Sequence, residues 1–447
     1  MTFRVPGFAL RFVSVLLFMV VVLLAQTGRA EIVEIVGETM GTTYSIKWVT
    51  ESDADAATPD REVIHKLVDQ RLDEILAMMS TYDPESELSR FNTQTSTEWF
   101  PVSAETAEVV EAALEVFRVS GGAFDPTVGR LVRMWRFGKD PAADGIPSEE
   151  EIESAMKSVG GQHVSVRLDP PAIKKSLPDV ELDLSAIAKG YGVDAIVELL
   201  GEQEIKNCLV EIGGEVRTSG RKGDQPWRLG VERPSSLNRE LQATVDLEDQ
   251  ALATSGNYRN FFEYDGKRYS HTIDPRTGWP VKHHLSSASV VADSCMLADA
   301  WATTLMVLGP EEGQRLADQE GITAYLITEN ESGIERLSTT AGAGSFVEVD
   351  PGNLQGNGQE SALTVFLITI LVFSLALSGL AVGVIFSNRA LKGSCGGAEG
   401  LKDDEGRSIC EMCTTPPEEC DQFKQQLKEK VASSSKSYGE SDSEASL

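Results

Sequence analysis

The sequence predicts a mixed α+β fold with a largely antiparallel sheet. Stretches rich in β-branched and aromatic residues alternate with stretches whose apolar residues recur at helical spacing. Two of the strand-like stretches, 241–247 and 261–270, look like parts of hairpins, and Asp265-Gly266 is typical of a tight turn within the second. Because hairpins join antiparallel strands, we expect antiparallel pairing to predominate.

The first elements follow in order from residue 31. Strands are expected at 31–36 and 43–49, and the apolar residues of 63–79 recur with the period of a helix. A second helix is expected directly after Ser103. The residues 148–151 have the Ser-x-x-Glu spacing of a capping box, which predicts the start of a further short helix.

The composition bounds the class of protein. With 447 residues, of which 41% are hydrophobic, the chain can bury a sizeable core and hold more than one unit. Its formal net charge of -29 argues against nucleic-acid binding, which requires a basic face. We therefore expect no nucleic-acid partner.

Residues 1–30 have the pattern of an export signal. Arg4 and Arg11 supply a positive start, the run 12–25 is apolar, and Gly28-Arg-Ala30 offers small residues for cleavage. The apolar run is shorter than the roughly 20 residues that a membrane span needs. The pattern leaves open whether the signal is cleaved, and it contains no cysteine that could carry a lipid.

A loop rich in functional groups is expected at 271–280. It places a histidine, a carboxylate, a guanidinium and a hydroxyl around Gly278, and Pro275 restricts its backbone. Gly278 can adopt a positive φ and let a ligand approach the main chain. This composition fits a ligand-binding loop, but it equally fits a polar turn between two strands.

A buried helix should follow at 296–308, ending at Gly309-Pro310. Asp299 and Thr303 lie one turn apart on it and share a face, so they offer two hard oxygen ligands of the kind that Mg²⁺ accepts. In the alternative interpretation, Asp299 caps the first turn and Thr303 bonds back to the carbonyl of Asp299.

Two further stretches carry candidate ligand-binding groups. Gly121-Gly122 would let the backbone run close to a planar ligand before Asp125, which could accept a hydrogen bond from it; a helix C-cap explains the glycines as well. Lys189 is expected near the start of a helix that follows a strand, where it could meet a diphosphate. A solvent-exposed lysine on an amphipathic helix is the alternative.

Seven motifs, in order along the chain, resemble those of the FAD:protein FMN transferases, the ApbE family. They are Thr39–Tyr44, Met79–Asn92, Gly122–Gly129, Asp183–Tyr191, Glu211–Glu215, His271–Gly278 and Ala298–Thr303. Together they extend the resemblance over roughly residues 31–349. The resemblance implies a fold of the T-fold type with the flavin in a cleft.

The resemblance also implies roles for individual residues. The residues that would contact FAD are Met40, Tyr82, Ala123, Phe124, Asp125, Asp183, Lys189 and Ile273. Mg²⁺ would be held by the backbone carbonyl of Ala186 together with Asp299 and Thr303. Cleavage of FAD between its two phosphorus atoms, with AMP leaving, requires neutralisation of charge more than covalent help.

His271 is the candidate general base for this chemistry. It would take the proton of the acceptor hydroxyl, with Asp274 or Asp293 as the orienting carboxylate. A purely phosphate-binding role for His271 is the alternative. The neighbouring His283 and His284 fall in a polar linker and are expected at the surface.

A membrane span is expected after the globular part. Residues 350–361 form a polar, glycine-rich linker, and 362–386 are almost wholly apolar and long enough to cross a bilayer. Arg389 and Lys392 follow directly, so the positive-inside rule places the C-terminal tail in the cytoplasm. Together with the export signal, this predicts a bacterial inner-membrane protein whose catalytic domain faces the periplasm.

The segment 387–422 predicts a metal site. Its four cysteines, Cys395, Cys410, Cys413 and Cys420, lie among polar residues and suit iron, an iron–sulfur cluster or Zn²⁺. The segment resembles NqrM, the maturation protein of the Na⁺-translocating NADH:quinone oxidoreductase, and this resemblance implies iron delivery to that complex. Residues 423–447 are charged and Ser-rich, and we expect them to be disordered. The remaining cysteines, Cys208 and Cys295, are expected to be buried thiols.

The two resemblances imply one function. We expect Mg²⁺-dependent transfer of FMN from FAD to a Thr or Ser hydroxyl on flavin-acceptor subunits of a membrane redox complex, such as the Na⁺-translocating oxidoreductase, with a tail that aids metal-centre maturation of the same complex. Two alternatives remain open. An FAD pyrophosphatase giving FMN and AMP would use the same residues, and a non-catalytic flavin or iron carrier would need neither the metal pair nor His271.

Overall fold

The computed structural model describes most of the globular part of the chain. The described residues are 31–50, 60–135, 137, 145–234, 240–257, 261–330, 333–349 and 369. The chain divides into two units, 1–351 and 352–447, and all elements below belong to the first. The predicted signal, linker, membrane span, cysteine-rich segment and charged tail lie outside the described residues, apart from residue 369. Within the described ranges, no helix is long and apolar enough to cross a membrane.

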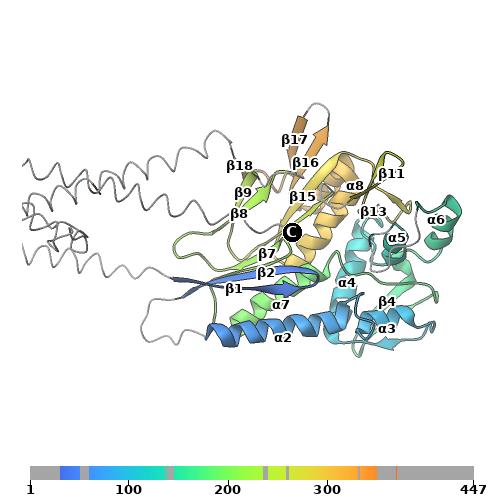
Figure 1. Ribbon diagram of the computed structural model, residues 1–447, viewed down its shortest axis with the longest axis horizontal. Coiled ribbons are helices and arrows are strands. Elements are labelled where there is room, and N and C mark those ends of the chain that lie inside the picture. Colours follow the sequence, from blue (N-terminus) through green and yellow to red (C-terminus); the bar gives the residue numbers. More distant parts are fainter. Residues whose placement is uncertain are drawn as a thin grey trace, which may run out of the picture. The chain divides into compact units, whose positions relative to one another are not determined.

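An eight-stranded antiparallel sheet forms the centre of the fold (Figure 1). Its strands, in spatial order, are β1 (Glu31–Thr39), β2 (Thr42–Thr50), β6 (Cys208–Ile212), β7 (Glu215–Ser219), β10 (Ala251–Gly256), β15 (Leu285–Ala292), β16 (Thr323–Asn330) and β17 (Gly333–Ser338). Every neighbouring pair is antiparallel. The predicted α+β class and antiparallel pairing are therefore confirmed.

Three helices cover one face of this sheet: α2 (Arg61–Met79), α7 (Ala188–Glu202) and α8 (Cys295–Glu320). Their apolar residues pack with buried side chains of the strands, including Trp48 and Val210. A three-stranded sheet of β8 (Trp227–Glu232), β9 (Leu241–Leu247) and β18 (Phe346–Glu348) contributes to a second cluster with Leu252 and Val291. Strand β15 is thus covered on both faces, which explains why it is buried along almost its whole length.

A second group of elements lies beside the main sheet and closes around a core of its own. It consists of α3 (Glu87–Thr93), β3 (Phe100–Pro101), α4 (Ala104–Val119), α5 (Gly129–Met134), α6 (Glu149–Met156), the 3-10 turn η1 (Gly161–His163), β4 (Val164–Leu168) and β5 (Pro171–Lys175). Ser103 caps α4, and Ser148 and Glu151 form the predicted capping box of α6. The sequence patterns for these helix starts are confirmed.

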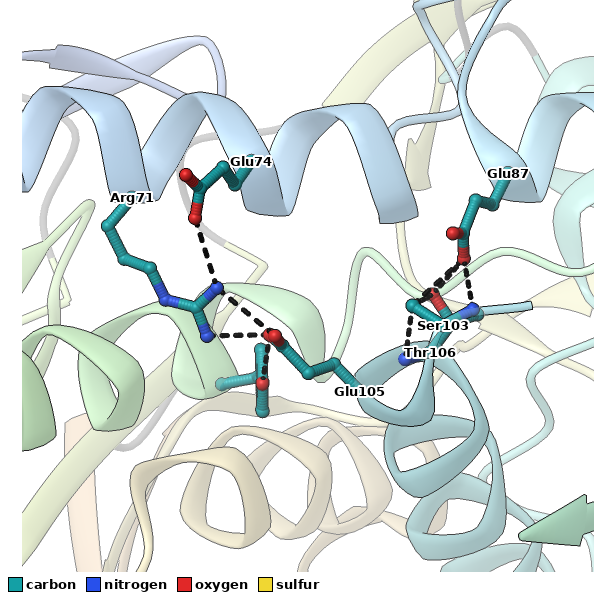
Figure 2. Close-up of polar contacts among 7 residues, drawn as sticks. Arg71, Glu74, Glu87, Ser103, Glu105 and Thr106 are labelled. Atoms are coloured by element: carbon teal, nitrogen blue, oxygen red, sulfur yellow. Dashed lines mark hydrogen bonds and ion pairs between the residues drawn. The ribbon is translucent and has the colours of Figure 1, made fainter. Parts of the chain in front are cut away.

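Polar side chains join the two groups (Figure 2). Glu105 at the start of α4 accepts hydrogen bonds from both Arg71 terminal nitrogens, at 3.2 and 2.6 Å, and from the hydroxyl of Tyr191 on α7. Nearby, the carboxylate of Glu87 accepts hydrogen bonds from the backbone N–H and the hydroxyl of Ser103. Because these contacts connect α2, α3, α4 and α7, they fix the orientation of the helices that border the cavity described below.

Two details differ from the sequence prediction. No strand precedes α7: residues 181–184 are irregular and are held by side chains from elsewhere in the chain. The buried helix also does not end at Gly309. Gly309 has φ 80° and interrupts the helix, but Pro310 then begins a further stretch, so α8 continues to Glu320. Proline is well accepted in a first helical turn, and this explains why the expected stop is a kink.

The predicted turns are present. Asp265 and Gly266 both have positive φ and join β11 (Phe261–Tyr264) to β12 (Lys267–Ser270) as a hairpin. The stretch 241–247 forms β9, antiparallel to β8. The expected buried thiols, Cys208 and Cys295, are both buried and unpaired.

Candidate active site

A cavity of about 1030 Å³ brings the sequence motifs together. Its walls come from residues 81–95, 123–137, 178–189, 213–215, 254–256, 271–275 and 299–307. These stretches are far apart along the chain and belong to both packed groups. The cavity therefore depends on the way in which α3, the start of α7 and the first part of α8 are held against each other.

Of the twelve predicted site residues that the structure describes, eleven line this one cavity. Those that do are Tyr82, Ala123, Phe124, Asp125, Asp183, Ala186, Lys189, His271, Ile273, Asp299 and Thr303. Met40 is not among the lining residues. It lies in the β1–β2 turn with φ 51°, and its methyl group packs so closely on Gly192 of α7 that a Cβ there would lie 2.9 Å from it. This packing keeps Met40 in the core.

The loop 271–280 is both a turn and a cavity wall, so the two interpretations of its sequence are compatible. Its residues form a short ladder between β13 (Ile273–Asp274) and β14 (Trp279–Pro280). Gly278 has φ 77°, and a Cβ there would meet Ile152 at 2.6 Å. The glycine is therefore required for close packing on α6, and not for access of a ligand to the backbone as we expected.

His271 lines the cavity, with its ring edge-on to Phe137 at 6.1 Å between centroids. The two predicted orienting carboxylates lie in different surroundings. Asp274 binds the guanidinium of Arg276 through both oxygens, at 2.9 Å each. Asp293 is exposed and is not a lining residue.

The two other predicted surface histidines differ from each other. His284 is exposed as expected, but His283 is half-buried. Its ring lies against Gly309 at the kink of α8, and its Nδ1 accepts the N–H of Leu285 at 3.3 Å. Burial lowers the pKa of His283. The kink, which the sequence did not reveal, created the space that this ring fills.

The first part of α8 presents Asp299 and Thr303 to the cavity. The alternative capping interpretation is wrong, because Ser294 caps α8 and Thr303 does not bond back to Asp299. Asp299 is 2% exposed, and its Oδ2 accepts the N–H of Gly190 at 3.1 Å. The hydroxyl of Thr303 lies 3.2 Å from that of Ser255 on β10. Both side chains are thus fixed by contacts with neighbouring elements.

Lys189 in the first turn of α7 connects Asp299 to a second acidic group. Its ammonium lies 3.8 Å from Asp299 Oδ2 and 2.7 Å from Glu215 Oε1. Glu215 begins β7, lines the cavity and is only 4% exposed. Glu215 is the last residue of the motif Glu211–Glu215, and no role was predicted for it; its position directly after two glycines was the available signal.

The ionisation of these three groups is coupled. Burial raises the pKa of Glu215 to about 7, against the opposing effect of the Lys189 ammonium. Burial raises the pKa of Asp299 as well. Burial also disfavours the Lys189 ammonium, but the charges of Asp299 and Glu215 outweigh this effect and raise its pKa. The site therefore contains two buried carboxylates that share one cation.

This donor set fits Mg²⁺. Asp299 and Thr303 supply hard oxygen ligands, the backbone of Ala186 lines the same cavity, and the surplus of carboxylate over ammonium charge favours a cation. Among the described residues, no group of three or more His, Cys, Asp or Glu side chains is arranged to hold a metal ion. A metal here would therefore depend on hydroxyl, carbonyl and water oxygens as well as on carboxylate.

Asp183 is presented to the cavity by an irregular segment that another motif residue holds. The side-chain amide of Asn92 donates to the carbonyl of Leu182 at 2.7 Å, and its oxygen accepts the N–H of Leu182 at 2.7 Å. Asp125 is buried nearby and accepts hydrogen bonds from the N–H and hydroxyl of Thr127. Burial raises the pKa of Asp125. Asn92 was quoted in a motif without a role, since no sequence pattern links it to residue 182.

Comparison with known proteins decides the family. A family model described as the ApbE family matches residues 40–326. The chain belongs to the ApbE family. A relative named FAD:protein FMN transferase from Vibrio cholerae is 41% identical over 313 residues, which are 70% of this chain and 92% of the relative. The protein of the same name from Escherichia coli is 38% identical over 68% of this chain and 86% of its own.

Solved structures of ApbE proteins agree with the fold. The flavin transferase ApbE from Vibrio cholerae matches with a TM-score of 0.64 and 40% identity, over 70% of this chain and 98% of its own. The apo form of Pseudomonas stutzeri flavinyl transferase ApbE matches with a TM-score of 0.65 and 36% identity, over 72% and 98%. Because almost the whole of each relative matches only part of this chain, the ApbE fold is complete without the C-terminal region. A second family model, described as (Na+)-NQR maturation NqrM, matches residues 384–433.

Proposed function

We propose that the cavity binds FAD and that this chain transfers its FMN part, in an Mg²⁺-dependent reaction, to a Thr or Ser hydroxyl of a target protein. The chain is an FAD:protein FMN transferase, like the relatives that it matches. One observation carries the assignment of the site: residues from six separate motifs, 82 to 303 in the sequence, meet on one cavity of about 1030 Å³.

The walls of the cavity suit the parts of FAD. Tyr82 at the rim is 58% exposed and can stack on a planar ring, while Phe124 and Ile273 supply buried apolar surface. Lys189 in the first turn of α7 offers an ammonium to the diphosphate. Asp125 and Asp183 supply acceptors for the hydroxyl and N–H groups of the nucleotide.

Asp299, Thr303 and the carbonyl of Ala186 would hold Mg²⁺. When bound there, Mg²⁺ supplies neutralisation of the charge that develops on the diphosphate. In the transfer, the acceptor oxygen forms a bond to the phosphorus of the FMN part, and the bond from that phosphorus to the bridging oxygen breaks, so that AMP leaves with the bridging oxygen. His271, which lines the cavity, takes the proton of the acceptor hydroxyl.

We further propose the placement and partners of the chain. The export-signal pattern of 1–30 and the apolar run 362–386 favour an inner-membrane protein with residues 31–349 in the periplasm. The match of 384–433 to NqrM supports flavin-acceptor subunits of a membrane redox complex, such as the Na⁺-translocating NADH:quinone oxidoreductase, as targets. The tail cysteines Cys395, Cys410, Cys413 and Cys420 would hold iron or zinc for maturation of the same complex.

The test is incubation of the 31–349 domain with FAD, Mg²⁺ and a purified acceptor subunit. In-gel flavin fluorescence on the acceptor is expected, and EDTA, Asp299→Ala or His271→Ala should abolish it. Glu198→Gln is a matched control, because Glu198 is exposed on α7 and lies outside the cavity lining. Release of FMN and AMP without labelling would instead indicate a pyrophosphatase, and intact FAD throughout would indicate a carrier.

A further inference from the structure

Glu215 has a feature that ion pairing with Lys189 does not explain. One of its oxygens contacts the ammonium at 2.7 Å, but the other, Oε2, is buried without a hydrogen-bond partner among the described residues. The residue is 96% buried and lines the cavity. Leaving a buried carboxylate oxygen unpaired is costly, so such an oxygen points to a donor that arrives with a ligand.

The position of Lys189 creates a second requirement. Its ammonium lies only 3.8 Å from Asp299 Oδ2, so a divalent cation bound to Asp299 would lie close to a like charge. An uncompensated ammonium at that distance would weaken cation binding. Glu215 lies on the other side of Lys189 and carries the charge that can offset it. The burial of the two carboxylates strengthens these interactions, because little water screens them.

We propose that Glu215 is a positioning residue of the metal site. One oxygen holds the Lys189 ammonium, the charge of the carboxylate offsets that ammonium so that a divalent cation can bind at Asp299 and Thr303, and the second oxygen accepts a hydrogen bond from the hydration shell of that cation. This inference deepens the proposed function and rests on its assignment of the metal site. It assigns a task to a motif residue that the proposed reaction otherwise leaves unused.

The alternative is that Glu215 only stabilises the fold. Glu215 could satisfy Lys189 as a structural ion pair, in which case its removal would lower stability but would not change metal affinity specifically. The two interpretations differ in a measurable way. A structural pair predicts that any effect on metal binding follows the loss of folded protein, whereas charge compensation predicts that the effect depends on whether Lys189 is present.

The experiment measures Mn²⁺ binding to the metal-stripped 31–349 domain by electron paramagnetic resonance, without FAD and without acceptor. Glu215→Gln keeps the size of the side chain but removes its charge, and its amide can place an N–H where an acceptor is required. We expect the Kd for Mn²⁺ to rise at least about 10-fold, the effect that loss of one charge a few ångströms from a divalent ion produces even at the dielectric of bulk water. Glu198→Gln, at an exposed position of α7 outside the cavity lining, should leave the Kd unchanged.

A charge-compensating pair completes the design. If Glu215 acts by offsetting Lys189, the double variant Lys189→Met with Glu215→Gln should bind Mn²⁺ within about threefold of the parent, because both members of the opposing pair are gone. The melting temperature of each variant reports whether it is folded. If Glu215→Gln alone does not fold, the double variant decides: binding close to that of the parent supports the proposal, and binding about 10-fold weaker overturns it.

Several results would overturn the inference. An unchanged Kd for Mn²⁺ in folded Glu215→Gln would overturn it. A double variant that binds Mn²⁺ as weakly as the single variant would overturn it as well. Suppose that Glu215→Gln binds FAD more weakly in the presence of EDTA but binds Mn²⁺ as the parent does. The hydrogen-bond donor to Glu215 Oε2 would then belong to the nucleotide, and the proposal would be contradicted. A parent domain that binds no Mn²⁺ would overturn this inference alone, because the proposed function is tested separately by flavin transfer to the acceptor.

Discussion

Asn92 should control FAD binding although it belongs to a different element from Asp183. Its amide group makes two hydrogen bonds of 2.7 Å with the N–H and carbonyl of Leu182, which is buried. Its own carbonyl accepts a hydrogen bond from the buried Lys175 at 3.2 Å, and Lys175 also donates to Val180. The irregular segment that presents Asp183 is therefore held at residues 180 and 182 through one asparagine and one lysine.

Replacement of Asn92 by alanine leaves both backbone groups of Leu182 without partners. A buried polar group that loses its partner costs about 1–3 kcal/mol, so two such groups would cost about 2–6 kcal/mol. Leu182 and Asn92 both line the cavity, where water can replace part of what is lost. We therefore expect Asn92→Ala to lower the free energy of unfolding by an amount at the lower end of this range, about 2–3 kcal/mol. For a domain of this size, this loss lowers Tm by roughly 5 °C or more.

The functional consequence should be a higher KM for FAD. Because the segment around Asp183 becomes mobile while His271, Asp299 and Thr303 keep their own contacts, we expect KM to rise about 10-fold and kcat to change less. Asn92→Asp should behave similarly, since a carboxylate keeps the acceptor but cannot donate to the Leu182 carbonyl. The assays are thermal unfolding and initial rates of AMP release at varied FAD.

Asn207 provides the matched control. Its side-chain oxygen accepts the N–H of Arg221 at 2.9 Å, but it is not a lining residue of the cavity. Asn207→Ala should cost about 1 kcal/mol of stability and leave the KM for FAD unchanged. Loss of stability in Asn92→Ala with an unchanged KM would refute the reasoning, because Asn92 would then support the fold without positioning Asp183.

Three further predictions concern stability, pH and thiol chemistry. Glu105→Gln should lower the free energy of unfolding by about 1–3 kcal/mol, because Arg71 loses one of two hydrogen-bond acceptors and the negative charge of its partner; chemical denaturation measures this change, and an unchanged midpoint would contradict it. Burial raises the pKa of Asp125 in the folded protein, so the protonated carboxyl contributes stability at low pH, and this contribution is lost as pH rises through the raised pKa. Asp125→Asn should flatten this part of the curve of stability against pH. A curve identical to that of the parent would be inconsistent with the shift. Burial raises the pKa of the Cys208 thiol to about 12, so in the native 31–349 domain it should not react with a thiol reagent at pH 8 but should react after unfolding; rapid labelling of the native protein would disprove its burial.

Local patterns were sufficient to predict most of the elements. The Ser103 cap and the capping box of α6 depend on residues within one turn of each other, so the sequence contains all the information. The hairpin at Asp265-Gly266 likewise depends only on residues that are close together in the sequence. The kink at Gly309 was not predictable in this way, because a Gly-Pro pair is equally typical of a helix end, and the His283 ring that packs against Gly309 comes from another part of the chain.

The site shows the same limit. Motif resemblance identified cavity-lining residues such as His271, Asp299, Thr303 and Lys189, and the structure brings them together. It did not reveal Glu215, whose significance depends on a 2.7 Å contact across 26 positions of sequence. Its assignment of Met40 to the FAD site stays a prediction, because the direction of that side chain is set by packing on α7 and not by the turn that contains it.

The most direct test of the central claim is mass spectrometry of peptides from an acceptor subunit after incubation with this chain, FAD and Mg²⁺. The reaction described here predicts one Thr- or Ser-containing peptide with an added FMN joined through phosphate, AMP released in equal amount, and neither product with Asp299→Ala. Free FMN and AMP in equal amounts, with every acceptor peptide unmodified, would contradict it.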